Sequence, residues 1–380
     1  MSALAVIVAV IWAYLLIARG QFWRASVRDT VAPPRPQRWP AVAAIVPARN
    51  EAETIAASVE SLLKQNYPGP LSVIVVDDDS NDGTAEIARA AARAAGGSVT
   101  VIASGGPPAG WTGKLWAQQQ GIAAAEAARP DYLLLTDADI VLAPDTLSWL
   151  IAQAVSGHFA LTSLMAKLRC VSLAERAHVP AFIYFFAMLY PFSWVYRSDR
   201  RTAAAAGGCM LVRAEALASA GGLAAIRNAL IDECSLAARL KGVGPIWLGL
   251  TGRVRSIRPY PTLADVAQMI SRSAYAQLNY SPWLLAATAA GMGLTFLAPP
   301  LLAIFASGWP QYLGAAAWLA MAASFVPTLR FYRLSVLWAP ALPAIAALYL
   351  SYTFLSAYRH LRRRGGQWKG RVHVNAPSLQ

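Results

Sequence analysis

Two aspartates separated by a single residue follow a short apolar run. The run is Tyr132–Thr136, and the aspartates are Asp137 and Asp139. Carboxylates at positions i and i+2, at the mouth of a buried strand, can bind a divalent cation, because Mg²⁺ and Mn²⁺ prefer oxygen ligands. A cation held there could bridge a diphosphate and stabilise it as it leaves. We therefore expect Mn²⁺ or Mg²⁺ as a cofactor, with Asp139 and Asp137 as its ligands.

Two further polar clusters follow apolar runs in the same way. Val42–Val46 is followed by Pro47, Ala48, Asn50 and Glu51, and Ser72–Val76 is followed by Asp77, Asp78 and Asp79. In an open α/β sheet, ligands bind beyond the carboxyl ends of the strands. Carboxylates there can accept hydrogen bonds from a base N–H and from ribose hydroxyls, and helix N-terminal amides favour phosphate. These residues are candidates for nucleotide binding. The alternative is an acidic turn before a helix, and we assign that structural role to Asp82 and Thr84.

A lysine in a glycine-containing loop lies between these clusters in the sequence. Gly110–Lys114 is not a P-loop, because Pro108 stands where the first glycine should be and Leu115 follows the lysine in place of Ser or Thr. Lys114 could still contact a phosphate or a ribose. The alternative is a solvated loop lysine.

Paired glycines and paired acids form the last cluster. Gly207 and Gly208 permit a close approach of the backbone to a sugar or an acceptor. Asp232 and Glu233 open an apolar-periodic helix, where a carboxylate could deprotonate an acceptor hydroxyl. The structural alternative is that these charges only suit the dipole of the helix.

Short β-rich runs alternate with alanine-rich helical stretches from about Trp39 to Pro261, which is typical of an α/β domain. The predicted strands are continuous apolar runs, as expected for parallel strands covered on both faces: Val42–Val46, Ser72–Val76, Val99–Ile102 and Tyr132–Thr136. The predicted helices are Glu51–Lys64 and Gly83–Ala95. We expect an α/β fold, a Rossmann-like domain over residues 39–262 with a mixed, mainly parallel sheet, and transmembrane helices at both ends of the chain.

The composition indicates a membrane protein. Of the 380 residues, 56% are hydrophobic and only 14% are charged, against roughly 25% charged residues in an ordinary soluble domain. The formal net charge is +13, and the basic residues lie beside long apolar runs. We therefore expect contact with anionic lipid headgroups and no nucleic acid partner. The 3 cysteines form no CxxC pair, so neither a disulfide framework nor a zinc site is expected.

The basic residues also predict a topology. Ala3–Ala18 has none before it and Arg19 soon after it, so residues 1–20 should be an uncleaved anchor with the following chain in the cytoplasm. An interfacial segment, residues 263–282, precedes membrane helices over 283–358, in three blocks: Trp283–Ala306, Tyr312–Thr328 and Leu334–Tyr358. The basic residues place both Arg330–Arg333 and the tail 359–380 in the cytoplasm. The last block lies between these two segments, so it cannot be a full crossing. We expect the last block, with Pro340 and Pro343, to be re-entrant. The predicted location is the cytoplasmic (inner) membrane, multi-pass.

One more apolar stretch, Val179–Tyr196, lies inside the expected α/β domain. Because the residues on both sides of it should belong to one cytoplasmic domain, a single crossing is not expected. An interfacial helix, or a shallow hairpin bent at Pro180 or Pro191, fits the pattern. A buried core helix is the alternative.

Together these clusters resemble the family 2 inverting glycosyltransferases of the GT-A fold, over roughly Ala41–Leu240. The likeness looks closest to the hopene-associated glycosyltransferases, relatives of the ceramide glucosyltransferases. The residues that carry the resemblance are Val46–Glu51, Gly110–Lys114, Thr136–Ile140, Arg272–Pro282 and Trp368–Arg371.

The resemblance implies roles for individual residues. Asp77 and Asp78 would hold the uridine, Asp139 the metal-bound diphosphate, and the second acid of a Glu-Asp pair would be the base. That pair reads Asp232-Glu233 here, in reversed order, and counting back from Leu236 puts Glu233 at the base position. Asp232 is the other candidate. The family's Gln-x-x-Arg-Trp element is represented by Gln277, with Asn279-Tyr280 near the place of Arg-Trp. We assign Gln277 and Tyr280, with the paired glycines, to the acceptor side.

The sequence therefore predicts a membrane-bound, metal-dependent, inverting glycosyltransferase. It would move a sugar from a nucleotide-sugar, a UDP-sugar by the resemblance, to a membrane lipid acceptor associated with hopanoids. One alternative is a polyprenyl-phosphate glycosyltransferase, whose acceptor phosphate needs no strong base. The other is a catalytically silent membrane scaffold that retains the nucleotide pocket.

Overall fold

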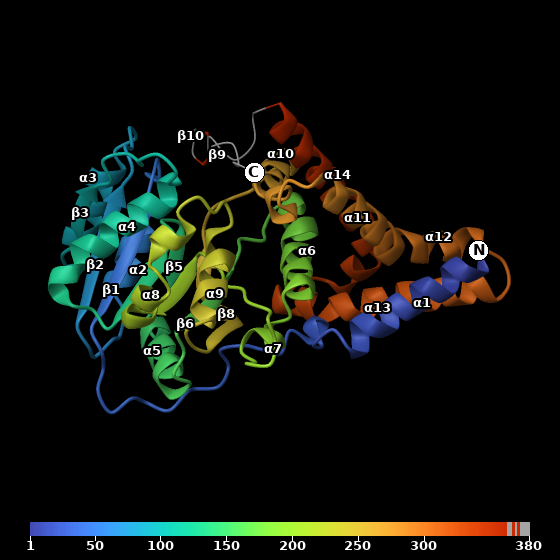
Figure 1. The fold of residues 1–380 in the computed structure, drawn as a ribbon, viewed down its shortest axis with the longest axis horizontal. Helices are drawn as coiled ribbons and strands as arrows, with labels where there is room; N and C mark the ends of the chain where they lie inside the picture. The colour runs from blue at the N-terminus through green and yellow to red at the C-terminus, as the bar shows by residue number, and fades with distance from the viewer. Residues whose placement is uncertain (363–366, 369–370, 373–380) are drawn as a thin grey trace. The chain divides into compact units, whose positions relative to one another are not determined.

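The computed structural model describes residues 1–362, 367–368 and 371–372, and the chain divides into two compact units (Figure 1). The predicted tail 359–380 and the motif Trp368–Arg371 lie partly outside these described residues. The α/β unit contains Val27–Arg169 and Trp194–Arg258. The helical unit contains Met1–Ser26, Cys170–Ser193 and the described residues from Pro259 to Arg362. In the C-terminal part, β9 (Gln367–Trp368) pairs antiparallel with β10 (Arg371–Val372).

An 8-stranded mixed sheet forms the centre of the α/β unit, in the order β3-β2-β1-β4-β7-β6-β8-β5. The strands are β1 (Val42–Ala48), β2 (Leu71–Asp77), β3 (Thr100–Ala103), β4 (Tyr132–Thr136), β5 (Ile140–Leu142), β6 (Leu161–Lys167), β7 (Cys209–Arg213) and β8 (Ile246–Ser256). The pairs of β1 with β2 and β4, of β2 with β3 and of β6 with β8 are parallel, and the pairs of β4 and β6 with β7 and of β5 with β8 are antiparallel. The mixed, mainly parallel sheet is confirmed.

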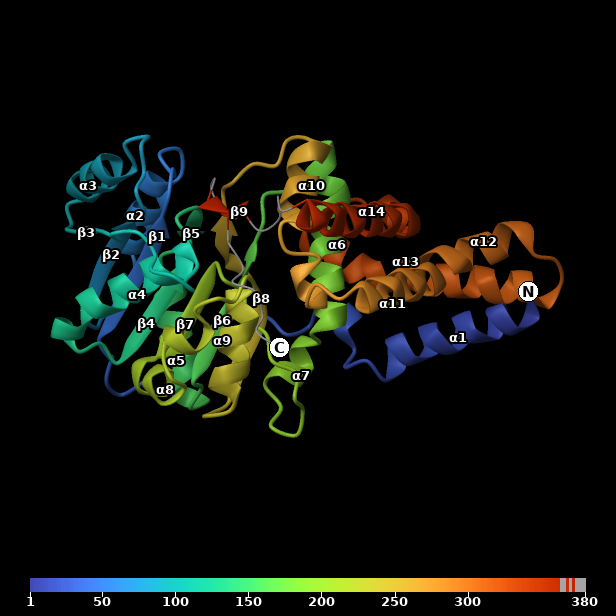
Figure 2. The same cartoon turned by 45° about the horizontal axis from the view of Figure 1, so that its top comes forward.

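Helices cover both faces of this sheet (Figure 1 and Figure 2). They are α2 (Ile55–Leu63), α3 (Thr84–Ala94), α4 (Gly113–Ala125), α5 (Thr146–Ser156), α8 (Ala214–Ser219) and α9 (Asp232–Lys241), while the short α7 (Phe192–Val195) crosses the boundary between the units. Ala44 and Val46 of β1 belong to the core that also contains residues of α2, α3 and α5. On the other face, a Cβ on Gly121 of α4 would lie 2.4 Å from Cγ2 of Ile45. Only glycine therefore permits this helix to lie so close to the sheet.

Predicted and observed elements agree closely in the first half of the α/β unit. The predicted strands all exist, Tyr132–Thr136 with the same bounds and the other three within one or two residues at either end. The helix predicted over Glu51–Lys64 begins only at Ile55. Its first residues stay in the loop because the backbone N–H of Glu51 donates to Oγ1 of Thr84 (2.8 Å) and that of Ala52 to Oδ2 of Asp82 (3.0 Å).

The helical unit has its own core. Its helices are α1 (Ser2–Ile17), α6 (Leu173–Leu189), α10 (Leu263–Ser271), α11 (Pro282–Met292), α12 (Ala298–Phe305), α13 (Trp309–Phe331) and α14 (Leu342–Leu361). A π-helical turn, Gly293–Leu297, joins α11 to α12, and a 3₁₀ helix, Val336–Ala341, precedes α14. Nε1 of Trp12 in α1 donates to the carbonyl of Thr295 in the π turn at 2.9 Å. This bond connects α1 to the π turn.

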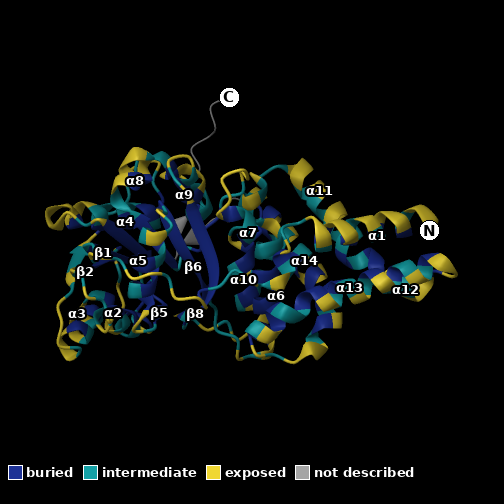
Figure 3. Ribbon diagram, turned by 90° about the horizontal axis from the view of Figure 1, so that it is seen from below, coloured by how far each residue is buried: buried dark blue, intermediate teal, exposed yellow. Residues whose placement is uncertain are grey.

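Four segments of the described chain are long and apolar enough to cross a membrane: Leu173–Val195, Pro282–Phe305, Trp309–Phe331 and Val336–Leu361. The first anchor, α1, is apolar but shorter. Many residues of α1, α11 and α12 are exposed (Figure 3). Large apolar side chains are among the exposed residues of α1 and of the four longer segments. Examples are Val10, Trp283 and Leu337, with relative exposures of 61%, 85% and 83%. Exposed apolar surface of this extent is typical of a membrane or protein contact.

The apolar stretch around Val179–Tyr196 forms α6, which packs in the core of the helical unit. The helix continues through Pro180 and ends at Leu189, before Pro191. Tyr184 Oη and Ser324 Oγ of α13 are 2.7 Å apart, and Tyr349 Oη of α14 donates to the carbonyl of His178 at 2.8 Å. These contacts pack α6 against α13 and α14, and the helix is not bent into a hairpin at Pro180.

Candidate active site

The predicted nucleotide-binding residues lie where β1 and β2 end, and backbone hydrogen bonds connect the two loops. Asp77 is in register with Ala48, and Pro47 with Val76. The N–H of Asp78 donates to the carbonyl of Ala48 at 2.8 Å, and Oγ of Ser104 donates to Oδ1 of Asp78 at 2.6 Å. Asp78 is therefore fully buried and fixed in place. Oδ1 of Asp77, in contrast, is buried without a hydrogen-bond partner among the described residues, so it can accept a bond from a ligand.

Two residues of these loops adopt a left-handed backbone. Asn50 has φ of 50° and Asp79 has φ of 65°. Oδ1 of Asn50 accepts a bond from the N–H of Asn81 at 3.0 Å, and the N–H of Asn50 donates to Oγ of Ser80 at 3.0 Å. Asx side chains tolerate this conformation because they can bond to nearby backbone. Asn50 thus holds the two loops together.

Asp82 and Thr84 have the structural role that the sequence predicted. Oδ1 of Asp82 accepts a bond from the N–H of Thr84 at 3.1 Å, at the start of α3. These bonds hold the pKa of Asp82 below its ordinary value, although desolvation acts in the opposite direction.

Asp139 and Glu51 are joined by one arginine. Nη2 of Arg258 lies 2.6 Å from Oε1 and 2.7 Å from Oε2 of Glu51, and its Nε lies 3.3 Å from Oδ2 of Asp139. Oγ of Ser256 donates to the same Oδ2 at 2.7 Å. Both carboxylates are buried. The segment after β8 therefore places the guanidinium of Arg258 beside two acids, Glu51 after β1 and Asp139 after β4.

Lys114 joins the remaining acids. Its Nζ lies 2.8 Å from Oδ1 of Asp137 and 3.7 Å from Oδ2 of Asp232. A Cβ on Gly207 would lie 3.3 Å from this Nζ and 3.8 Å from Cδ of Glu233. Lysine, three acids and a glycine from four separate parts of the sequence are thus neighbours. The solvated-lysine alternative is wrong, since the Lys114 side chain is only 19% exposed.

The electrostatics of this cluster suit a base. Burial raises the pKa of Glu233 to about 8, and the negative charge of Asp232 acts in the same direction. Burial alone would lower the pKa of Lys114, but the carboxylates of Asp137, Asp232 and Glu233 together raise it above its ordinary value. The lysine therefore stays charged while Glu233 can exchange a proton near neutral pH.

The paired glycines have different surroundings. Gly207 faces the cluster, whereas a Cβ on Gly208 would lie 2.9 Å from Cδ1 of Ile140, and the carbonyl of Gly208 accepts a bond from Oγ1 of Thr136 at 2.8 Å. Gly208 thus permits close packing at the end of β4. The predicted acceptor residues Gln277 and Tyr280 belong to the helical unit. There Nε2 of Gln277 donates to Oη of Tyr190 at 2.6 Å, and the ring of Tyr280 stacks on His360.

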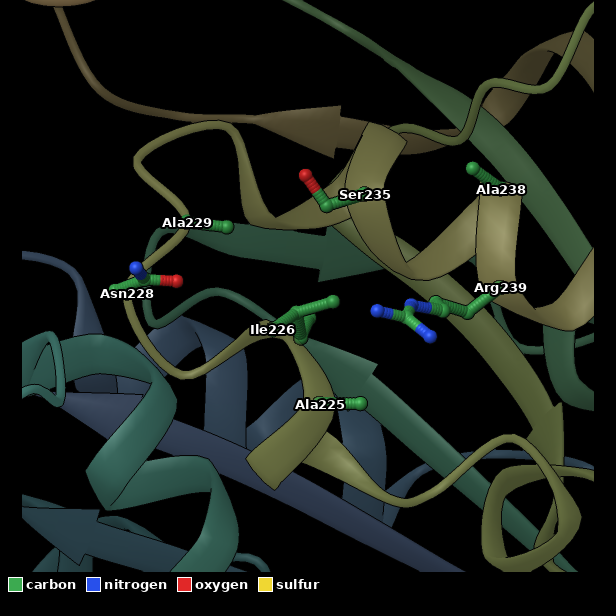
Figure 4. A pocket seen from close by; sticks show the side chains of 7 residues that line it. All are labelled: Ala225, Ile226, Asn228, Ala229, Ser235, Ala238 and Arg239. Carbon is green, nitrogen blue, oxygen red and sulfur yellow. The ribbon is translucent and has the colours of Figure 1, made fainter. Parts of the chain in front are cut away.

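A hollow of about 380 Å³ lies beside α9 and the 3₁₀ turn Leu223–Ile226 (Figure 4). It is lined by Ala225, Ile226, Asn228, Ala229, Ser235, Ala238 and Arg239. None of these residues was predicted for the site. Ser235 Oγ donates to the carbonyl of Ile231 at 2.8 Å, so its hydroxyl already has a partner within α9.

The sequence did not indicate Arg258, Ser256 or Ser104. Arg258 has no local motif, and its role depends on the parallel pairing of β8 with β6, which brings the end of β8 to the site. The only available signal was its position just after a long β-rich run. Ser104 resembles many other serines in loops.

The sheet and the acids at its strand ends define a nucleotide-sugar-binding domain of the GT-A class. Residues 43–220 match the family model described as Glycosyl transferase family 2. Over these residues the chain is therefore similar to the family 2 glycosyltransferases, as its motifs predicted.

Two known proteins illustrate the likeness. An N-acetylglucosaminyltransferase of Mesorhizobium japonicum is 34% identical over 117 residues, which are 30% of this chain and 26% of that protein. The match thus spans about a quarter of the relative's length. The mannosyltransferase PcManGT of Pyrobaculum calidifontis, solved in complex with GDP-Man and Mn²⁺, has a TM-score of 0.53 at 20% identity. That match covers 94% of this chain and 99% of PcManGT. At this identity it shows the shared fold.

Proposed function

We propose that this protein is a membrane-bound glycosyltransferase that moves a sugar from a nucleotide-sugar to a lipid acceptor with inversion at the anomeric carbon. The observation that carries the proposal is the cluster around Lys114. Its Nζ contacts Asp137, from the predicted cation-binding pair, and approaches Asp232, next to the predicted base. The groups needed at the donor diphosphate and those needed at the acceptor are thus neighbours.

The donor would bind along the ends of β1, β2 and β4. Asp77 supports a nucleoside site because its buried Oδ1 has no protein partner among the described residues, and a base N–H would supply one. Asp78 and Asp79 follow in the same loop, and Pro47 and Ala48 of β1 are in register with Val76 and Asp77 of β2. By the resemblance, the nucleobase of the donor would be uracil. Lys114, being charged, would contact phosphate or ribose.

A divalent cation, Mn²⁺ or Mg²⁺, fits the acids at the end of β4. Asp137 and Asp139 offer only oxygen atoms, which these cations prefer. Both acids already face a cationic side chain, Lys114 and Arg258 respectively, so a divalent cation would share their carboxylates with these groups. When bound, the cation would stabilise the negative charge on the departing diphosphate.

The chemical step would use Glu233, with Asp232 as the alternative base. The carboxylate takes the proton of an acceptor hydroxyl, and the hydroxyl oxygen forms a bond to the anomeric carbon. The bond from that carbon to the diphosphate oxygen breaks, and the nucleoside diphosphate leaves with the electron pair. Gly207 supports this geometry, because a side chain there would occupy space beside both Lys114 and Glu233.

A lipid acceptor is supported by the helical unit. Four of its helical segments are apolar and long enough to cross a membrane, and basic residues around them predict a cytoplasmic α/β unit. We propose an anchor at 1–20, the catalytic domain at 39–262, an interfacial segment at 263–282 and membrane helices at 283–358. Within the catalytic range, Cys170–Ser193 and the residues from Pro259 onward belong to the helical unit. The likeness to hopene-associated glycosyltransferases makes a hopanoid-related lipid the first acceptor to test, with Gln277 and Tyr280 on the acceptor side.

Lipid analysis in cells tests the proposal. Lipids from cells that make the wild-type protein, Asp139→Ala or no protein would be compared by mass spectrometry. We expect one glycosylated lipid that requires the wild-type protein and is lost with Asp139→Ala. Identical lipid profiles in all three strains would contradict the lipid acceptor.

A further inference from the structure

Arg258 is placed at the junction of two acidic groups that come from different strands. Its Nη2 contacts both carboxylate oxygens of Glu51, at 2.6 Å and 2.7 Å, and its Nε lies 3.3 Å from Oδ2 of Asp139. The arginine side chain is 27% exposed, whereas those of Glu51 and Asp139 are 9% and 12% exposed. One guanidinium therefore covers two largely buried carboxylates.

This arrangement uses one of the oxygen atoms that a divalent cation at Asp139 would need. Oδ2 of Asp139 faces Arg258 and also accepts a hydrogen bond from Oγ of Ser256 at 2.7 Å. A guanidinium has no acceptor and keeps its charge at every accessible pH. A cation that approaches Asp139 therefore meets both an occupied oxygen and a repelling positive charge.

The protein oxygens near Asp139 are also too few for a cation on their own. Within the described part of the chain, no group of three or more His, Cys, Asp or Glu side chains could hold a metal ion. Mg²⁺ and Mn²⁺ prefer about six oxygen ligands. The missing ligands must come from elsewhere, and the diphosphate of the donor has oxygen atoms suited to both the cation and the guanidinium.

We propose that Arg258 couples cation binding to donor binding. In the free protein its guanidinium occupies the acids and keeps the affinity for divalent cations low. The donor diphosphate draws the guanidinium away from Asp139 and supplies the missing oxygen ligands, so cation and donor bind together. Arg258 is thus a positioning residue. This inference rests on the proposed role of Asp139 as a cation ligand.

Mn²⁺ binding to the purified full-length protein tests the inference without any sugar transfer. Bound and free Mn²⁺ are distinguished by electron paramagnetic resonance, with and without UDP. For the wild type we expect weak binding that becomes at least about tenfold tighter with UDP. For Arg258→Met without UDP we expect binding at least about tenfold tighter than wild type, and a correspondingly smaller effect of UDP. Unchanged or weaker Mn²⁺ binding by Arg258→Met would overturn the proposal.

Arg253, within β8, gives a matched control for Arg258, which lies just after the end of β8. Arg253 is also 27% exposed and also lies between two acids, 3.5 Å from Oδ2 of Asp29 and 3.6 Å from Oδ2 of Asp145. Arg253→Met removes the same charge away from Asp139, so it should bind Mn²⁺ like the wild type. If Arg253→Met tightens Mn²⁺ binding as much as Arg258→Met does, the effect is one of net charge and the coupling role is wrong.

Two further variants keep the test decisive. If Arg258→Met unfolds, Arg258→Lys retains the charge but lacks the fork that reaches both acids, and we expect severalfold tighter Mn²⁺ binding without UDP. Wild-type affinity in a folded Arg258→Lys would then contradict the inference. Asp139→Asn should lose UDP-dependent Mn²⁺ binding in every background. If it does not, the proposed cation site itself is wrong, whatever Arg258 does.

Discussion

The charges around Lys114 decide which acid can act as the base. Glu233 and Asp232 are adjacent at the start of α9, and side chains of adjacent helical residues point about 100° apart. Asp232 lies 3.7 Å from the lysine ammonium and so already faces a cationic partner. Glu233, with its raised pKa, is the better proton acceptor near neutral pH. Two neighbouring acids can thus have different roles.

Substitution of the two acids separates these roles. We expect Glu233→Gln to lose about 10²–10⁴-fold in turnover while donor binding is kept, because general-base catalysis is typically worth that much. Asp232→Asn should lose less. Glu233→Asp withdraws the carboxylate by roughly 1.5 Å, one C–C bond, and should be intermediate. The measurement is turnover at saturating donor for all three variants.

Two outcomes would contradict the assignment of Glu233 as the base. If Asp232→Asn is inactive and Glu233→Gln is active, Asp232 is the base. If both stay active, the acceptor is an already ionised phosphate, as in the polyprenyl-phosphate alternative.

The pH dependence of the reaction follows from the pKa of Glu233. A base must be ionised, so kcat/KM should rise with pH up to about 8 and level off above it. The same shift affects stability. Because the folded-state pKa is raised, Glu233 contributes most stability when protonated and loses it as the pH rises through about 8. In Glu233→Gln, kcat/KM should therefore not rise with pH. Between pH 6 and pH 9 this variant should also lose less thermal stability than the wild type. A kcat/KM that is flat over this range would contradict the assignment.

At the scale of elements, the position of α4 controls the position of Lys114. The helix begins at Gly113, where Oγ1 of Thr112 accepts a bond from the N–H of Leu115, and Gly121 lies against the sheet. A Cβ on Gly121 would meet Cγ2 of Ile45 at 2.4 Å and Cγ2 of Val76 at 2.9 Å. Both contacts are with buried strands that have little freedom to move.

Gly121→Ala should therefore destabilise the α/β unit by about 1–3 kcal/mol, the usual range for overpacking a core, and weaken donor binding by moving Lys114. Gly252→Ala is the control, because a Cβ at Gly252 meets nothing within 4 Å. Thermal unfolding and UDP binding measure the two effects. Equal behaviour of the two variants would show that α4 does not need glycine.

The elements also show what the sequence can and cannot predict. Tyr132–Thr136 was predicted with its observed bounds, because a continuous apolar run next to acids is a local signal. The insertion of β7 between β4 and β6 was not predictable, since antiparallel pairing with β4 joins residues about 75 positions apart in the sequence, such as Thr136 and Cys209. Arg258 was missed for the same reason. Gly207, Asp232 and Glu233 were found as motifs, but their contact with Lys114 depends on the fold.

At the scale of the whole molecule, the basic residues predict the orientation in the membrane. Residues 20–282 and the tail should face the cytoplasm, while the uncharged loop between the first two C-terminal blocks should face outward. Single cysteines at Ser307 and Ser378, in a protein without its 3 native cysteines, would report these positions. An impermeant thiol reagent added to intact cells should label Ser307→Cys and not Ser378→Cys. Labelling of Ser378→Cys from outside would show that the predicted topology is wrong.

The central claim is that one chain binds a nucleotide-sugar and transfers its sugar to a lipid by means of Glu233. The most direct measurement is transfer of radiolabelled sugar from UDP-sugars to extracted membrane lipids by the purified protein with Mn²⁺. We predict a labelled lipid whose anomeric configuration is opposite to that of the donor, formed by the wild type and about 10²–10⁴-fold more slowly by Glu233→Gln. A labelled lipid with retained configuration, or one formed equally fast by Glu233→Gln, would contradict this account.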